Sequence, residues 1–188
     1  MKALDLYCGL GGWTKGLKEV GFDVVGVDIA KEIILYYPGK LIIQDVRTID
    51  GKRFKGKFDV IVGSPPCRDF SKTTNFGKVK WKNPPNPENG LKLVHAFLRI
   101  VEEAQPKIWL MENVVGLCKY LNIKPKVIAY LTPTMRRAFW GNFPPFLIPC
   151  VGREKIENIT GKLRSWKRAE IPFPVAFSFA QACKEVLK

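Results

Sequence analysis

The stretch that decides the fold is KALDLYCGLGGWTKGLKEVGFDVVGVD, residues 2–28. Its first part, 2–8, is largely apolar and is followed at once by glycines, which mark a turn. Residues 11–21 then place apolar side chains at helical spacing and end at Gly21, a common signal for the end of a helix. A second apolar run follows at 22–28. The pattern predicts a strand, a glycine-rich turn, a helix and a second strand.

The same alternation continues along the rest of the chain. Residues 89–106 form the clearest amphipathic helix, with a stripe of apolar side chains and Pro106 at its end. Further strands are predicted at 40–46, 58–64, 107–113, 125–131 and 136–142. Apolar strands that alternate with helices predict an α/β fold, with a mostly parallel central sheet and helices on both faces. Ligands of such sheets bind beyond the carboxyl ends of the strands.

The composition bounds the class of partner. The chain has 188 residues, suited to one domain, and a net charge of +14. Most of the excess positive charge lies in two blocks, residues 47–92 and 119–168. Such blocks attract a polyanion such as nucleic acid, although the lysine-rich surface of a heat-adapted protein would look the same. Composition alone leaves both alternatives open.

The cysteines and the N-terminus indicate the cellular setting. The five cysteines are scattered without a CxxC pair and there is one histidine, so no metal site is predicted. An odd number of scattered cysteines is typical of free thiols inside the cell. No apolar run is long enough to span a bilayer, and the first residues have the pattern of a strand rather than of a signal peptide. We therefore expect a cytoplasmic protein with no membrane partner.

Polar groups follow the first three predicted strands. The turn at 9–12 has the spacing Gly-x-Gly-Gly, which lets the backbone pass close to a bound nucleotide. Asp28 ends the second strand, where a carboxylate can accept from ribose hydroxyls, and Asp45 follows the third, where it can accept from an adenine amine. A tight structural turn and a solvated acid are the alternatives. Together, the three positions predict a nucleoside cofactor.

A second motif is DVIVGSPPCRDFS, residues 59–71. A buried strand brings Cys67 to the edge of the sheet where the cofactor is expected. Pro65 and Pro66 fix φ and remove two backbone donors, which holds the thiol in one position. A nucleophilic cysteine needs nearby positive charge, and Arg68 is adjacent. An inert, buried cysteine after a turn is the alternative.

Two further motifs bring charged side chains to the same edge. WLMENV, residues 109–114, ends an apolar strand in Glu112, whose carboxyl is expected to have a raised pKa and to donate a hydrogen bond or a proton. In TPTMRRAFWGNFP, residues 132–144, Arg136 and Arg137 begin a strand, so their side chains point to opposite faces. At most one of them belongs to the site. We assign Arg136 to the surface and keep it as the alternative to Arg137.

In order and content, these motifs resemble the DNA (cytosine-5) methyltransferase family. DLYCGLGGWTKGL resembles its first motif, GSPPCRDFS its proline–cysteine motif and MENVVG its glutamate motif. MRRAFWGNFP resembles the arginine motif, and AEIPFPVAFSFAQACKEVL resembles the final motif, which returns a helix to the cofactor face. The resemblance covers nearly the whole chain. It implies a Rossmann-like methyltransferase fold that uses S-adenosyl-L-methionine to methylate C5 of cytosine in DNA.

The resemblance also implies a role for each matching residue. Cys67 would add to C6 of the cytosine, Glu112 would bind and protonate N3, and Arg137 would contact O2. The cofactor residues implied are Tyr7, Cys8, Gly9, Leu10, Gly11, Gly12, Asp28, Ile29, Asp45, Val46, Pro66, Leu93 and Glu170. The residues expected to contact nucleic acid, in and beside a lid over the flipped base, are Arg68, Ser71, Lys72, Lys78, Lys80, Trp81 and Lys82.

The chain departs from the family where the target-recognition region is usually inserted. Only residues 143–170 stand there, so we divide the chain into a catalytic domain, 1–142 plus 171–188, and a short remnant of that region. A partner protein that supplies sequence recognition would fit this reduction. The same chemistry on RNA such as tRNA, and a non-catalytic subunit that binds nucleic acid or regulates a partner, are the alternatives.

Overall fold

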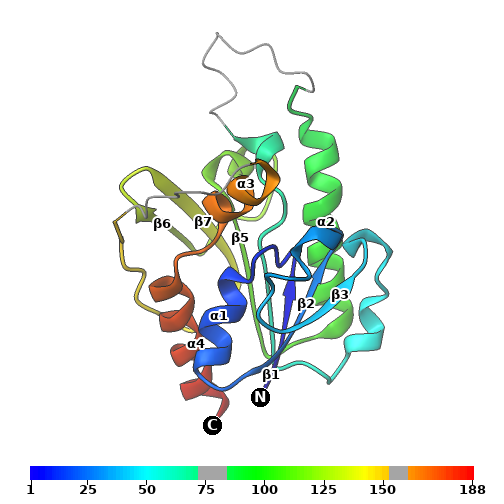
Figure 1. The fold of residues 1–188 in the computed structure, drawn as a ribbon, viewed down its shortest axis with the longest axis vertical. Coiled ribbons are helices and arrows are strands. Elements are labelled where there is room, and N and C mark those ends of the chain that lie inside the picture. The colour runs from blue at the N-terminus through cyan, green and yellow to red at the C-terminus, as the bar shows by residue number, and fades with distance from the viewer. Residues whose placement is uncertain (72–83, 153–160) are drawn as a thin grey trace.

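The computed structural model describes residues 1–71, 84–152 and 161–188. Within them, seven strands form one sheet in the order β3-β2-β1-β4-β5-β7-β6 (Figure 1). The strands are β1 Lys2–Leu6, β2 Asp23–Asp28, β3 Lys40–Ile43, β4 Val60–Gly63, β5 Ile108–Val114, β6 Val127–Thr132 and β7 Met135–Asn142. Neighbouring strands are parallel except at β7, which runs antiparallel to β5 and β6. The predicted mostly parallel sheet is confirmed.

Helices cover both faces of this sheet. On one face, α1 (Gly12–Glu19) packs beside α4 (Phe173–Leu187), whereas α2 (Pro87–Ala104) covers the other (Figure 1). A further helix, α3 (Gly161–Ala169), lies beyond the carboxyl ends of the strands (Figure 1). It falls in the segment 143–170, for which the sequence analysis predicted no helix. The architecture is the predicted α/β, Rossmann-like fold.

The turn from β1 to α1 is shaped by three residues with a left-handed backbone, Tyr7, Gly9 and Gly11. β1 ends at Leu6, earlier than predicted, because Tyr7 has a φ of 59° and leaves the extended conformation. Gly11 has a φ of 79°, and α1 begins at the next residue. A Cβ on Gly11 would lie 2.6 Å from Cδ of Pro38. Glycine is thus required there by the turn itself and by its close neighbour.

Helices α1 and α4 approach each other closely at Gly16. A Cβ at this position would lie 2.3 Å from the carbonyl carbon of Ala176, so a larger residue would push the two helices apart. Beside this contact, the ring of Trp13 meets the rings of Phe179 and Phe139 edge to face, with centroids 5.4 and 6.5 Å apart. This packing fixes the last helix, and the residues just before it, against the first.

Capping side chains explain two boundaries that differ from the prediction. β3 ends at Ile43 rather than at residue 46, because the carboxylate of Asp45 accepts from the backbone N–H of Arg47 and begins a short 3₁₀ turn. α2 begins at Pro87 rather than at residue 89, because Asn86 accepts from two amides of the first turn. In both places a local hydrogen bond decides where the element starts or stops.

Two properties of the described residues bear on other classes of function. No helix among them is long and apolar enough to cross a membrane. They contain no group of three or more His, Cys, Asp or Glu side chains that could hold a metal ion. The five cysteines are all free thiols.

The division of the chain into a catalytic domain and a short remnant stays a prediction.

Candidate active site

A cavity of about 1140 Å³ opens at the carboxyl ends of the central strands. Every residue predicted to bind the cofactor lines this cavity except Gly11, which lies against Pro38 instead. Cys67 and Arg68 also line it. The fold therefore brings together residues from the ends of β1 to β4, from α2 and from the start of the final motif.

Several lining residues were missed by the sequence analysis. They include Asp5, Trp13, Arg47, Ser64 and Trp166. Arg47 directly follows the predicted strand 40–46 and Ser64 is the last residue of the predicted strand 58–64, so including these strand ends among the site candidates would have found both. Trp166 comes from α3, and no sequence signal placed that helix over the cavity.

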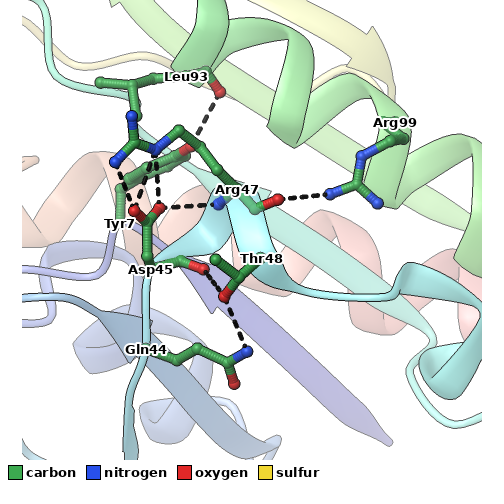
Figure 2. A network of polar contacts seen from close by, with 7 residues as sticks. All are labelled: Tyr7, Gln44, Asp45, Arg47, Thr48, Leu93 and Arg99. Carbon is green, nitrogen blue, oxygen red and sulfur yellow. Dashed lines mark hydrogen bonds and ion pairs between the residues drawn. The ribbon is translucent and has the colours of Figure 1, made fainter.

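A polar network surrounds Asp45 at the end of β3 (Figure 2). The carboxylate accepts from the backbone N–H, Nε and Nη2 of Arg47, at 2.9, 3.0 and 2.5 Å. These hydrogen bonds hold the pKa of Asp45 below its ordinary value. The hydroxyl of Tyr7 donates to the carbonyl oxygen of Leu93 at 2.8 Å, which ties the end of β1 to α2 (Figure 2). Arg47 thus holds the carboxylate of Asp45 in place as an ionised acceptor at the cavity wall.

Two more carboxylates stand at the ends of β1 and β2. Asp28 accepts from the backbone N–H groups of Gly9 and Ala30, both at 2.9 Å, and so holds the glycine-rich turn against β2. Asp5 is buried, and its Oδ2 accepts from the hydroxyl of Thr14 at 2.7 Å. Its Oδ1 has no hydrogen-bond partner within the described part of the chain. Burial raises the pKa of Asp5 to about 7.

Glu170 closes the cavity near the start of the final motif. Its side chain is largely buried, and it forms ion pairs with Lys15 of α1 and, at 2.8 Å, with Lys167 of α3. Burial of a carboxylate is favourable only when it is paired in this way. Glu170 therefore joins three segments of the chain at the cavity wall.

The most buried ion pair lies between β5 and β7. Nε of Arg137 is 2.6 Å from Oε1 of Glu112, and the two side chains are 14% and 5% exposed. Burial raises the pKa of Glu112, while Arg137 and a hydrogen bond from Ser64 act in the opposite direction. The direction of this shift agrees with the expectation from the sequence. Arg136 points elsewhere, and its guanidinium lies 5.7 Å from the ring centroid of Tyr130 on the surface.

Cys67 lies at the cavity wall, half-buried, at the end of the segment that follows β4. Burial raises the pKa of its thiol, and the negative charge of Glu112 raises it further. Arg137 is the cation that favours the thiolate. Burial and the charge of Glu112 thus oppose ionisation of the thiol and Arg137 favours it, so a change in the charge of either neighbour would shift that balance.

The backbone before the thiol is tied to the strand that carries Glu112. Nδ2 of Asn113 donates to the carbonyl oxygen of Pro65 at 2.9 Å. Because Asn113 is buried and follows Glu112 directly, this bond fixes the spacing between the two motifs. Of the residues predicted to contact nucleic acid, Arg68 lines the cavity and Ser71 is half-buried just beyond it. The others, Lys72, Lys78, Lys80, Trp81 and Lys82, lie outside the described residues.

Comparison with known proteins relates this site to one family. The model of the C-5 cytosine-specific DNA methylase family matches residues 1–131. The type II methyltransferase M.FnuDI of Fusobacterium nucleatum is 32% identical over 127 residues, which covers 65% of this chain and 35% of the relative. The type II methyltransferase M.AplI of Arthrospira platensis is 33% identical over 133 residues, covering 68% and 36%.

The fold is also shared with a solved structure. The methyltransferase EhMeth of Entamoeba histolytica superposes with a TM-score of 0.57 at 15% identity, covering 84% of this chain and 57% of that one. At this identity the likeness concerns the fold alone. The chain spans about a third of the length of the two curated relatives.

Proposed function

This chain belongs to the C-5 cytosine-specific DNA methylase family, and on that basis we propose that it transfers a methyl group from S-adenosyl-L-methionine to C5 of cytosine in DNA. The observation that carries the proposal is the position of Cys67. Its thiol lies at the wall of the large cavity and interacts with the buried pair of Glu112 and Arg137. A nucleophile at the wall of a nucleotide-sized space thus has a buried acid and a cation as its charged neighbours.

The cavity residues fit the proposed cofactor. Asp28 and Asp45 offer carboxyl oxygens that can accept from the hydroxyls and the amine of an adenosine. The unpartnered Oδ1 of Asp5 is an acceptor that a cationic ligand would satisfy. Tyr7, Ile29 and Leu93 supply apolar surface between these groups. When bound, S-adenosyl-L-methionine would supply an electrophilic methyl group.

The resting charges suggest how the thiol becomes reactive. Glu112 and Cys67 oppose each other's ionisation, because each negative charge raises the pKa of the other group. If Glu112 holds a proton and shares it with N3 of the base, its negative charge no longer opposes the thiolate. Arg137 then remains as a positive neighbour of Cys67. Binding of the base thereby favours the thiolate, which adds to C6 and makes C5 nucleophilic.

The remaining steps restore the protein. After C5 has taken the methyl group, loss of the proton from C5 lets the thiolate leave C6, and Cys67 is regenerated. The base must leave a duplex to reach the thiol, and the basic blocks of the chain would hold the phosphates around it.

The test is transfer of labelled methyl from S-adenosyl-L-methionine to duplex DNA, single-stranded DNA and tRNA. We expect label in DNA with the wild type and none with Cys67→Ser. Cys150→Ser is the matched control, since this thiol is exposed and does not line the cavity. Label confined to tRNA would change the substrate class. No label on any substrate, from protein that binds the cofactor, would favour a non-catalytic role.

We further propose that a partner protein supplies sequence recognition. The proposal rests on the short segment between β7 and α4, where the resemblance to the family leads us to expect a long target-recognition region. We expect the purified chain to methylate cytosines with little preference for the surrounding sequence. Methylation of a single sequence in a duplex by the chain alone would contradict this.

A further inference from the structure

A second, smaller cavity of about 220 Å³ adjoins the cofactor cavity. Glu170 and Ile171 line both cavities and so form the wall between them. The rest of the lining comes from α1, the β6–β7 hairpin, residues 151–152, the end of α3 and the start of α4. Sites that enclose a whole small molecule usually measure roughly 300–1,000 Å³, so this cavity suits one ring system of a larger ligand.

Cations outnumber acids around this second cavity. Among its described lining residues, Lys15, Lys167 and Arg168 are basic, whereas Glu170 alone is acidic. The carboxylate of Glu170 pairs with both lysines, so that group keeps one positive charge in excess. The exposed guanidinium of Arg168 adds another. A ligand of this cavity should therefore be an anion.

The uncharged part of the lining is apolar and includes an open aromatic ring. Phe173 is 46% exposed, and its ring stacks on that of Phe177 with the centroids 5.7 Å apart and the planes 21° from parallel. A rigid flat ring beside cations is the arrangement on which a nucleobase stacks while its phosphate is held by a positive side chain. The second cavity thus combines the two features that bind a nucleotide within a strand.

The second cavity also lies near the groups proposed to hold the target base. Met135 of β7 lines it, and Arg137, which pairs with Glu112, is two residues further along the same strand. Side chains two residues apart share a face of the sheet and are separated by about 7 Å. Because B-form DNA rises about 3.4 Å per base pair, the neighbours of a base at Glu112 are within reach of this cavity.

We propose that the second cavity binds a nucleotide of the DNA substrate that flanks the target cytosine, with its phosphate attracted by Arg168 and the two lysines and its base stacked on Phe173. The identity of the ligand as DNA rests on the proposed function, whereas the binding can be measured without methyl transfer. A stacking surface accepts any base. The site therefore agrees with the weak sequence preference that we expect of the chain alone.

The first test is photocrosslinking of the wild type to a duplex of A·T pairs with a single C·G pair. Each thymine is replaced in turn by 5-iodouracil, and crosslinked peptides are identified by mass spectrometry after irradiation. We expect crosslinks to the peptide that contains Phe173, strongest from the positions beside the cytosine. The absence of crosslinks to residues 168–174 from every position would overturn the proposal.

The second test measures binding of the same duplex by fluorescence anisotropy at several salt concentrations. Arg168→Gln should lower the salt dependence of log Kd by about 0.9, as expected for the loss of one phosphate contact. The matched control is Arg164→Gln, because this exposed arginine lies on the same helix and lines neither cavity. An equal change in both variants would indicate a diffuse positive field and would overturn the phosphate contact.

The aromatic contact is tested in the same assay. Phe173→Ala should weaken binding about fivefold or more without changing the salt dependence, because it removes a stacking surface and no charge. Phe173→Tyr keeps the ring and should bind like the wild type. Leu147→Ala is the matched control, since this exposed side chain does not line the cavity. Unchanged binding in Phe173→Ala would overturn the stacking.

The two proposals fail in different ways. If the wild type transfers methyl to DNA while Arg168→Gln and Phe173→Ala bind the duplex as the wild type does, the second cavity is not a nucleotide site and the proposed function stands. If the crosslinks and the losses of affinity are found in a wild type that transfers no methyl, the proposed function is refuted and the binding site is supported.

Discussion

Replacement of Arg137 by methionine should destabilise the protein in a way that depends on pH. The guanidinium lies 2.6 Å from Glu112, and both side chains are largely buried. Removal of one partner from a buried ion pair costs about 3–5 kcal/mol if the other partner stays charged. Glu112 can escape this cost by taking up a proton, because burial already raises its pKa. The loss of stability is therefore set by the pH of the measurement.

The sign follows from the folded-state pKa of Glu112. That pKa is raised in the wild type and should be raised further in Arg137→Met, while the unfolded value is unchanged. At acidic pH, Glu112 is protonated in both folded proteins, so the variant loses little stability. Above the folded-state pKa of Glu112 in the wild type, the difference in free energy of unfolding between wild type and variant should grow by up to about 1.4 kcal/mol per pH unit, to about 3 kcal/mol.

Urea denaturation at pH 5 and pH 8 would measure this difference. Arg136→Met is the matched control, because the neighbouring guanidinium is exposed and lies over the Tyr130 ring. Its loss should cost at most about 1 kcal/mol at either pH. Equal destabilisation of Arg137→Met at both pH values would refute the reasoning about Glu112, as would an equally large loss in Arg136→Met.

Three further predictions follow from the site. Glu112→Gln removes a negative charge that raises the pKa of Cys67, so alkylation of this thiol should begin at a lower pH than in the wild type. Mass spectrometry would measure the extent of alkylation at each pH, and an unchanged pH profile would contradict the prediction. In Gly116→Ala the new Cβ would lie 1.9 Å from a carbonyl oxygen of the segment after the thiol, so the free energy of unfolding measured by denaturation should fall by more than about 2 kcal/mol. The control Gly152→Ala places its Cβ against no neighbour and should leave the stability nearly unchanged. The pKa of Asp5 is raised to about 7 in the folded protein, so the ligand-free wild type should become less stable as the pH rises toward 7. Plotted against pH, the urea midpoint of Asp5→Asn should lack the part of the decline that is due to Asp5.

The order of the elements followed from the sequence because apolar runs and helical stripes report burial directly. β4 and β5 are buried on both faces, and each was predicted within two residues of its observed bounds. The boundaries near the site were less accurate, because single hydrogen bonds and left-handed residues decide them. Tyr7 and Asp45 are examples, since both end their strands early to face the cavity.

The electrostatic partners in the site were predicted only in part. Strand alternation predicted that at most one of Arg136 and Arg137 belongs to the site, and the family resemblance favoured Arg137. The structure places Arg137 beside Glu112. The hydrogen bond from the Trp13 indole to Ser64 was not predicted, because it joins the first helix to the end of β4 and leaves no signal in the local sequence. The helix α3 was missed for a similar reason, since its contacts are tertiary and its sequence is mostly polar.

The position of the two prolines explains why the chain is stiff just before its thiol. Residues 64–67 pass between α1 and β5, where Ser64 contacts Trp13 and the carbonyl of Pro65 accepts from Asn113. An ordinary residue at Pro65 would bring a buried N–H that needs a partner of its own. Proline removes that donor and fixes φ, so the segment is satisfied by its carbonyl and its side chains. The thiol of Cys67 is thus positioned by the neighbouring strand and helix, and its position does not depend on a bound ligand.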